Sequence, residues 1–156
     1  MQAKAKISYN AGKLASNLPK IIQKHMQRYA RSSEKGSKEA IDKGILIEPL
    51  DEQGFIMGGK IKGIKNITRI VRHNRGITGT KPLYETGNLH RSIKSKDGKL
   101  TMLHYGILHH RGFTTSPKSM FPNKKVPARP FIGASKKEIL SIFDAFKKDI
   151  RRNFRK

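Results

Sequence analysis

Residues 105–135 read YGILHHRGFTTSPKSMFPNKKVPARPFIGAS, and the expected fold is organised around this stretch. It closes on VPARPFIG at 126–133, directly before a long amphipathic segment. Pro127 and Pro130 favour an extended backbone here, because proline fixes its own φ and disfavours the α conformation for the residue before it. Arg129 is therefore presented from a stiff segment, which predicts a role in placing a specific contact.

A capping box precedes the strongest helix signal in the chain. Ser135 supplies the hydroxyl and Glu138 the carboxylate three residues later. Apolar residues then recur in steps of three and four, at Ile139, Ile142, Phe143, Phe146, Ile150 and Phe154. This pattern predicts a helix over 136–153. We expect its apolar face to pack on the hairpin described next, and a seam between subunits is the alternative.

The clearest turn is Asp97-Gly98, a pair that accepts positive φ at both central positions of a hairpin turn. The flanking segments 91–96 and 99–105 are therefore predicted to pair as antiparallel strands. A two-stranded hairpin is not stable alone, so it must pack on a helix or join a larger sheet.

The N-terminal part predicts a helix preceded by an arm. Residues 1–16 are polar and lysine-rich, which indicates a flexible basic arm or a frayed first turn. Asn17 and Pro19 are typical of a helix start. Residues 33–43 either continue this helix or begin a second one, which Gly44 ends. A short strand is expected just after it, over 45–47.

Residues 54–81 form a basic, glycine-containing excursion that we expect to order on assembly. Its isoleucines recur about every three positions, which suits a helical face, yet β-branched residues equally suit a strand. The sequence leaves both open. Its candidate polyanion contacts are Lys60, Lys62, Lys65, Arg69, Arg72 and Arg75.

Together these elements predict an α+β fold, with an antiparallel sheet built around the hairpin and packed against N-terminal and C-terminal helices. A chain of 156 residues is long enough for one domain with a real core. We place that domain at 17–156, including the excursion.

Charge is the dominant global property, since 34 Lys and Arg against 11 Asp and Glu give +23. Such a surface favours nucleic acid, an anionic membrane or an acidic protein, and a solvated lysine-rich surface is the simpler alternative. No apolar run approaches the ~20 residues of a membrane span, and MQAKAKISYN lacks an apolar leader region. We therefore expect a cytoplasmic product with no membrane partner.

No group of residues predicts catalysis. His104, His109 and His110 cluster, but zinc needs three or four ligands and no Cys or nearby acid completes the set. Adjacent His109 and His110 cannot easily face the same way. Paired carboxylates are hard to assemble from so few acids. The sequence predicts no enzyme, no metal and no cofactor.

Three blocks in order resemble the phage virion morphogenesis proteins, the tail-completion or neck components that join a head connector to a tail. LYETGNLHRSI (83–93) is similar to TG-x-L-x-x-S-I, YGILHHRG (105–112) to Y-A-x-x-H-Q-x-G, and VPARPFIGAS (126–135) to I-P-A-R-P-F-L-G-x-S. The resemblance covers roughly residues 83–150. Gly106 replaces Ala and His110 replaces Gln, Trp is absent, and residues 54–81 have no counterpart.

The resemblance implies a virion structural protein of the neck, made in the host cytoplasm, whose copies form a ring that is expected to be sixfold. Its partners would be the portal adaptor or connector and the tail tube or terminator proteins. Genomic DNA would pass through the ring, which would contact the DNA phosphates. The implied fold and assembly positions are Thr86, Gly87, Leu89, Ser92 and Ile93 at the start of the hairpin, Tyr105, His109 and Gly112 at the next corner, and Pro127, Arg129, Pro130, Phe131 and Gly133 before the last helix.

Two questions stay open at this point. Arg129 should reach Glu138 or Glu85 in its own subunit, or a carboxylate or carbonyl groups on a neighbour. The alternative function is a sequence-independent nucleic-acid-binding protein of ribosomal or nucleoid type, which charge alone supports.

Overall fold

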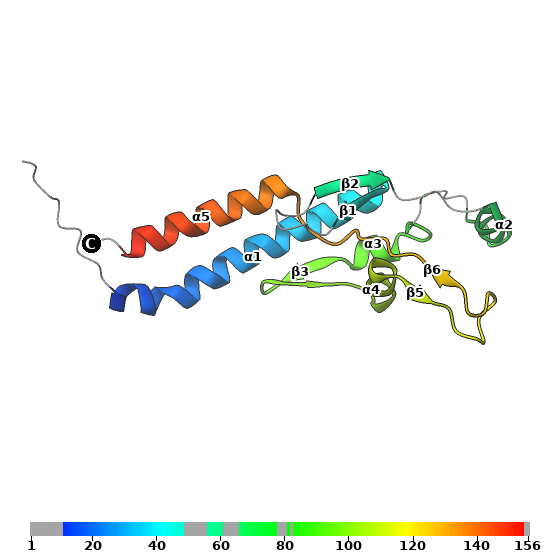
Figure 1. The fold of residues 1–156 in the computed structure, drawn as a ribbon, viewed down its shortest axis with the longest axis horizontal. Coiled ribbons are helices and arrows are strands. Elements are labelled where there is room, and N and C mark those ends of the chain that lie inside the picture. The colour runs from blue at the N-terminus through cyan, green and yellow to red at the C-terminus, as the bar shows by residue number, and fades with distance from the viewer. Residues whose placement is uncertain (1–10, 49–55, 61–65, 78–80, 82, 155–156) are drawn as a thin grey trace, which may run out of the picture.

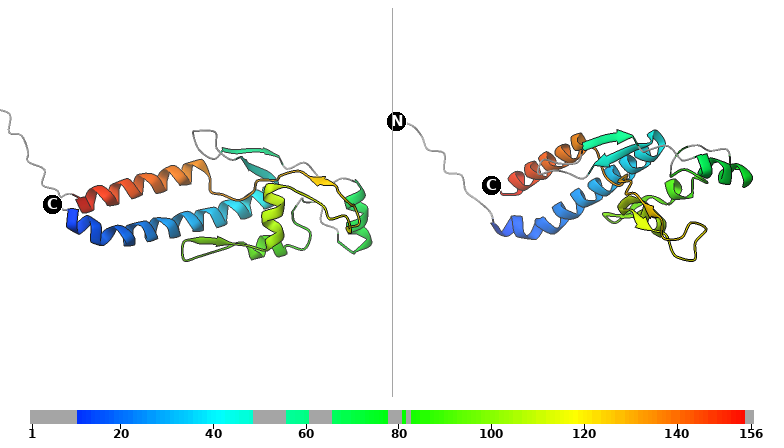
Figure 2. Two further views of the ribbon diagram at one scale, coloured as in Figure 1. Left: turned by 60° about the horizontal axis from the view of Figure 1, so that its bottom comes forward. Right: turned by 45° about the vertical axis from the view of Figure 1, so that its right-hand side comes forward.

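The computed structural model describes residues 11–48, 56–60, 66–77, 81 and 83–154. Two long helices, α1 (Ala11–Lys43) and α5 (Lys136–Phe154), lie side by side and form one end of an elongated molecule (Figure 1). The shorter elements gather around the C-terminal half of α1 and beyond it (Figure 2). The predicted α+β class is confirmed, with the N-terminal and C-terminal helices in contact and small antiparallel sheets packed against α1.

The described strands form three separate two-stranded antiparallel sheets. They are β1 (Ile45–Glu48) with β2 (Ile56–Lys60), β3 (Lys94–Lys96) with β4 (Lys99–Thr101), and β5 (Phe113–Thr114) with β6 (Lys125–Val126). The remaining helices are α2 (Asn66–Asn74), α3 (Asn88–Ser92) and α4 (His104–Arg111). The excursion that the sequence left open therefore holds both a strand, β2, and a helix, α2.

Helix α1 begins earlier than the sequence indicated. It starts at Ala11 rather than Asn17, so residues 11–16 of the expected arm are helical, and Pro19 lies inside the helix. A proline there removes one backbone hydrogen bond, but packing of a helix against a neighbour commonly outweighs such local costs. Here the Asn17 side chain donates to Asn153 Oδ1 on α5 at 3.1 Å. Residues 33–43 continue the same helix, and Gly44 follows it with a φ of 63°.

The Asp97-Gly98 hairpin is confirmed. Lys94 pairs with Thr101 and Lys96 with Lys99, and the two turn residues have φ values of 50° and 77°. The strands are shorter than predicted, because residues 91–92 belong to α3 and residues 104–105 to α4.

Glu34 of α1 binds the hairpin. Its Oε2 accepts hydrogen bonds from the backbone N–H and the hydroxyl of Ser95, both at 2.7 Å, while Oε1 lies 2.6 Å from Lys38 Nζ. Lys38 and then Ser95 lower the pKa of Glu34 to about 2. A single carboxylate thus joins β3 to the long helix.

The capping box of α5 is confirmed. The Glu138 N–H donates to Ser135 Oγ at 3.4 Å, and Glu138 Oε2 accepts from the Ser135 N–H at 3.3 Å. The expected packing of α5 on the hairpin is wrong, because α5 packs along α1 instead. Asp149 makes this contact specific, since its Oδ2 lies 2.7 Å from Lys24 Nζ and 3.0 Å from His25 Nε2.

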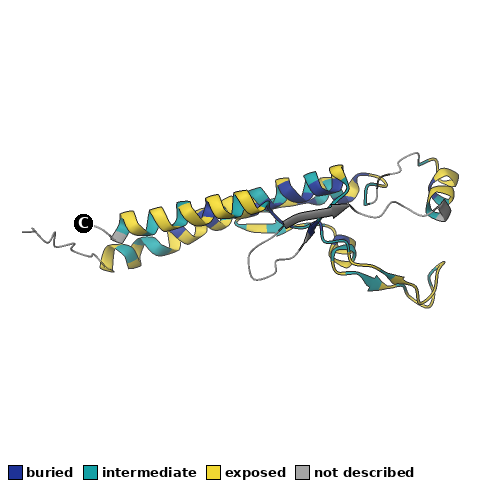
Figure 3. Ribbon diagram, turned by 45° about the horizontal axis from the view of Figure 1, so that its top comes forward, coloured by how far each residue is buried: buried dark blue, intermediate teal, exposed yellow. Residues whose placement is uncertain are grey.

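The main core lies where the C-terminal half of α1 meets β1, α3 and the segment before α5 (Figure 3). Its buried members are Ala40, Ile41, Ile47, Leu89, Ile93 and Phe131. Phe131 has the largest of the fully buried side chains and comes from residues 127–133 (PARPFIG), called the PARPF segment below. Strand β1, helix α3 and the segment before α5 are short, so packing in one common core against α1 is what orders them.

A row of small buried residues lets that segment approach α1 closely. The row consists of Ser33, Gly36, Ser37 and Ala40, at helical spacing of three and four. A Cβ built on Gly36 would lie only 2.4 Å from the Gly133 carbonyl oxygen. Gly36 is therefore required by backbone-to-backbone contact.

We predict that Gly36→Ala lowers the melting temperature. In an exposed helix the change would stabilise by about 1 kcal/mol, but a forced shift of packed backbone costs roughly 1–3 kcal/mol. Exposed Gly12 of the same helix offers a matched control, and Gly12→Ala should leave the melting temperature unchanged or slightly higher. Equal effects of the two variants in thermal unfolding would contradict the close approach.

Candidate assembly site

The PARPF segment is held through its own backbone. The Arg129 N–H donates to the carbonyl of His109 in α4 at 2.9 Å, and the Pro130 carbonyl accepts the N–H of Ile47 in β1 at 2.6 Å. Phe131, the next residue along the segment, places its ring in the core. An extended segment without a strand partner thus has its polar groups satisfied by its neighbours.

Helix α1 supplies the third attachment. The Gly133 N–H donates to Ser37 Oγ at 3.1 Å, and the same hydroxyl donates to the Ser33 carbonyl at 2.6 Å. Both Gly133 and Ser37 are buried. The serine therefore serves as acceptor for the segment and donor to its own helix.

His110 provides a fourth attachment, from α4. The N–H groups of Phe131 and Ile132 both donate to its Nδ1, at 3.2 and 3.3 Å, and its ring meets the Phe131 ring edge to face at 5.8 Å. A nitrogen that accepts two N–H groups carries no proton, so the imidazole is neutral with its hydrogen on Nε2. Burial, and then the charge of Arg111, lower the pKa of His110, which also favours the neutral ring.

His109 faces different surroundings from its neighbour. Its ring meets those of Tyr105 and Phe113 edge to face, at 6.3 and 5.4 Å. Its Nδ1 is buried and has no hydrogen-bond partner among the described residues. Burial, and then the charge of Arg129, lower the pKa of His109, which favours the neutral ring.

Gly112 allows α4 to end directly against the PARPF segment. Its φ of 77° lies in the region that favours glycine, and an added Cβ would lie 2.8 Å from the Ala128 nitrogen. Exposed Pro127 lies beside this contact. The second and third motif blocks therefore meet at backbone distance.

The first motif block (83–93) contacts the second and third blocks through the core. Leu89 and Ile93 are core residues, and Gly87 precedes α3 with a φ of 73°. The Ser92 hydroxyl donates to the Leu89 carbonyl at 2.7 Å and accepts the N–H of Leu103 at 3.1 Å. Thr86 accepts a hydrogen bond from Arg91 through its carbonyl.

Gly106 shows how closely the first two blocks pack. A Cβ on Gly106 would lie 2.6 Å from Leu89 Cδ1 and 3.1 Å from Met102 Sδ. An added methyl group here would require the side chains of Leu89 and Met102 to move. All three blocks therefore share one site, although they are separated in sequence.

Arg129 carries the unbalanced charge of this site. It is half-buried, and no side-chain hydrogen bond or ion pair joins it to another residue of the described ranges. Burial, and then the charge of Arg72, lower the pKa of Arg129. A guanidinium stays protonated regardless, so Arg129 is a partly desolvated cation that also feels the positive charge of Arg72.

Neither acid proposed from the sequence reaches Arg129. Glu85 lies 3.9 Å from Arg72 Nε and 3.8 Å from Arg75 Nη1, and Glu138 belongs to the capping box. Of the two options that the sequence left open, the internal ion pair is absent from the described residues. A contact with another molecule remains as the prediction.

The candidate polyanion residues do not form one uniform patch. Arg69 and Arg75 on α2 are exposed, whereas Arg72 is buried and donates to the Lys81 carbonyl at 3.0 Å. Lys60 ends β2, and Lys62 and Lys65 lie outside the described residues. Arg72 is therefore a structural residue.

The part of the chain that the structure covers holds no group of three or more His, Asp or Glu able to bind a metal ion. None of its helices is long and apolar enough to cross a membrane. Comparisons with protein-family models, curated proteins and solved structures found no match for this chain.

Sequence reasoning missed the α1 side of the site. Ser37 and Gly36 lie far from the motif blocks in sequence, so no local pattern linked them to Gly133. Their signal was the small-residue spacing in α1, which is typical of a helix that another backbone approaches closely.

We predict that His110 makes stability depend on pH. Its pKa is lower in the folded state, so its contribution is complete above the unfolded pKa of about 6.5 and is lost as pH falls toward the folded value. His110→Gln keeps an acceptor for the two N–H groups but cannot titrate. Melting temperature should therefore fall less between about pH 7.5 and about pH 5 in this variant than in the unmodified chain.

A remaining slope is expected in His110→Gln, because the pKa of His109 is lowered too. Exposed His104 in the same helix is the control, and His104→Gln should keep the full slope. An unchanged slope in His110→Gln would show that this imidazole does not accept the two hydrogen bonds.

Proposed function

We propose that this chain is a structural protein of a phage neck, a tail-completion protein whose copies form a ring between the head connector and the tail. The observation that carries the proposal is the meeting of the three motif blocks around Phe131, next to a half-buried Arg129 that has no acid partner among the described residues. Leu89, Gly106, Gly112 and Phe131 bring the blocks together. The residues that resemble the family thus lie at one place.

The energetics of Arg129 favour a contact outside the subunit. Holding a charged group partly away from water is unfavourable unless an opposite charge or hydrogen-bond acceptors compensate for the lost hydration. Arginine is well suited to that task, since its planar fork binds a carboxylate through two parallel hydrogen bonds. A carboxylate of a neighbouring copy or of a connector protein would supply this compensation.

The net charge fits such a position. A charge of +23 opposes association of copies in the absence of counter-charge. DNA passing through the ring, or acidic surfaces on the connector and tail proteins, would offset that repulsion. The exposed Arg69 and Arg75 are available for phosphate contacts, although Glu85 lies near Arg75.

Sequence-independent nucleic-acid binding is the alternative function, and the same charge supports it. Such a protein would contact phosphates through many exposed cations and would not depend on the half-buried Arg129. The fate of Arg129 variants therefore separates the two functions.

We predict that Arg129→Ala and Arg129→Lys both fold and both fail to assemble. Because no ion pair among the described residues is lost, the melting temperature of Arg129→Lys should stay the same, and that of Arg129→Ala should rise slightly as repulsion from Arg72 is relieved. Ring formation at about 0.15 M salt, followed by negative-stain imaging and light scattering, should be seen for the unmodified chain and lost in both variants.

Exposed Arg31 of α1 provides the charge-matched control, and Arg31→Ala should assemble normally. A sharp drop in melting temperature for Arg129→Ala with a harmless Arg129→Lys would instead make this arginine an internal support. Absence of rings in the unmodified chain, with tight duplex binding, would favour the alternative function.

A further inference from the structure

An apolar groove runs along the helix pair at the end of the molecule away from Arg129. Ile22, Met26 and Tyr29 of α1 form one wall, and Ile139, Phe143 and Phe146 of α5 form the other. The hollow between them has a volume of about 460 Å³, and Gly98 of the hairpin turn reaches it. The main core around Phe131 includes none of these residues.

The walls of this groove are unusually open to water for large apolar side chains. Met26 is 51% exposed and Phe143 is 56% exposed. Ile22, Tyr29 and nearby Leu140 are exposed as well. Contiguous exposed apolar surface of this kind is typical of binding sites for another molecule.

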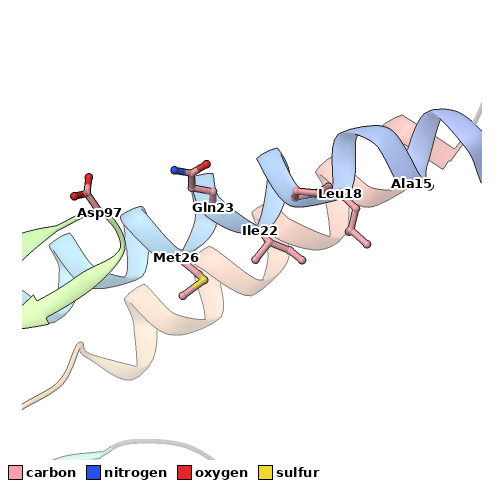
Figure 4. A pocket seen from close by; sticks show the side chains of 7 residues that line it. Ala15, Leu18, Ile22, Gln23, Met26 and Asp97 are labelled. Atoms are coloured by element: carbon pink, nitrogen blue, oxygen red, sulfur yellow. The ribbon is translucent and has the colours of Figure 1, made fainter.

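The shape of the groove suits a helix. A second hollow adjoins this groove and shares Ile22 and Met26 with it. Leu18, Ile22 and Met26 line that hollow at spacings of four on one face of α1, beside the hairpin turn at Asp97 (Figure 4). From Leu18 to Tyr29 the row spans about 17 Å at 1.5 Å per residue. A partner helix of about three turns, with apolar residues at helical spacing, would match that length.

The charged residues at the rim of the groove indicate what kind of helix it would bind. On α5, exposed Lys136 lies four residues before Leu140, and exposed Lys147 lies four residues after Phe143. Exposed Lys96 and Lys99 flank the hairpin turn. The exposed acids on these elements are fewer, namely Asp97 and Asp144, and Asp144 lies 3.8 Å from Lys147.

A second copy of this chain is a poor occupant, because it would bring the same lysines against each other. Lysines at a rim favour a partner with carboxylates at matching positions, and they disfavour a basic partner. We propose that this groove binds an amphipathic helix of a partner protein, with an apolar face and acidic flanks. This inference is independent of the ring and of Arg129.

The direct test uses a fluorescein-labelled synthetic helix of about 15 residues, with leucines on one face and glutamates on the rest. Fluorescence anisotropy should show saturable binding to the unmodified protein. A scrambled peptide and a peptide with lysines replacing the glutamates should bind at least about tenfold more weakly. Equal binding of the lysine peptide would overturn the assignment of an acidic partner.

Variants locate the site. Met26→Glu and Phe143→Glu should each weaken binding of the glutamate peptide at least about tenfold, because each replaces an apolar contact on one wall by a negative charge. Met120, 70% exposed on the β5–β6 loop, provides the matched control, and Met120→Glu should bind as the unmodified chain does. Full binding by Met26→Glu and Phe143→Glu would place the peptide elsewhere and overturn the proposal.

Charge reversal tests the rim without altering the apolar walls. The exposed pair Lys136→Glu/Lys147→Glu should bind the glutamate peptide more weakly and the lysine peptide more tightly. Circular dichroism and melting temperature establish whether each variant is folded. If Met26→Glu or Phe143→Glu does not fold, binding by the charge-reversal pair decides whether the groove is the peptide site. Conversion of self-associated protein into monomers by Phe143→Glu would make a second copy the occupant and refute the acidic helix.

Discussion

The fold depends on one extended segment, residues 129–133, whose backbone is bound by three different parts of the chain. Helix α4 supplies the His109 carbonyl and the His110 imidazole, β1 supplies the Ile47 N–H, and α1 supplies the Ser37 hydroxyl. The segment carries Phe131 into the core at the same point. Short elements that could not be stable alone are thereby fixed relative to the long helix.

The few acids of the chain explain much of its remaining architecture. Glu34 joins α1 to the hairpin, Asp149 joins α5 to α1, and Glu138 caps α5. Glu85 lies between Arg72 and Arg75. With these carboxylates committed to internal contacts, the cation excess is left on the surface, and Arg129 has no acid partner within the described part of the chain. Both proposals, for Arg129 and for the lysine-rimmed groove, follow from this shortage of acid.

Local chemistry allowed several elements to be predicted from the sequence. Asp97-Gly98 determined the hairpin turn, Ser135 and Glu138 determined the start of α5, and Gly44 determined the end of α1, because each depends on residues within a few positions of one another. The start of α1 was placed too late, since contacts with α5 outweigh the proline at position 19. Amphipathic periodicity likewise identified α5 as a helix but could not name the surface that it packs on.

The site itself was half predictable. The PARPF segment and the two motif blocks before it stand out in sequence, and the structure brings all three blocks together. Their partners Gly36 and Ser37 did not stand out, because the contact joins residues almost one hundred positions apart. Arg72 was expected among the polyanion contacts from its charge alone, and only its buried position shows its structural use.

Native-state hydrogen exchange tests most directly whether residues 129–133 hold the fold together. We predict that the amides of Phe131, Ile132 and Gly133 exchange only through global unfolding, with the same free energy of opening as the amide of Ile41 in α1. The experiment belongs above about pH 7, where His110 is neutral. Exchange of these three amides more than about tenfold faster than that of Ile41 would show that the segment opens locally, and would contradict the account.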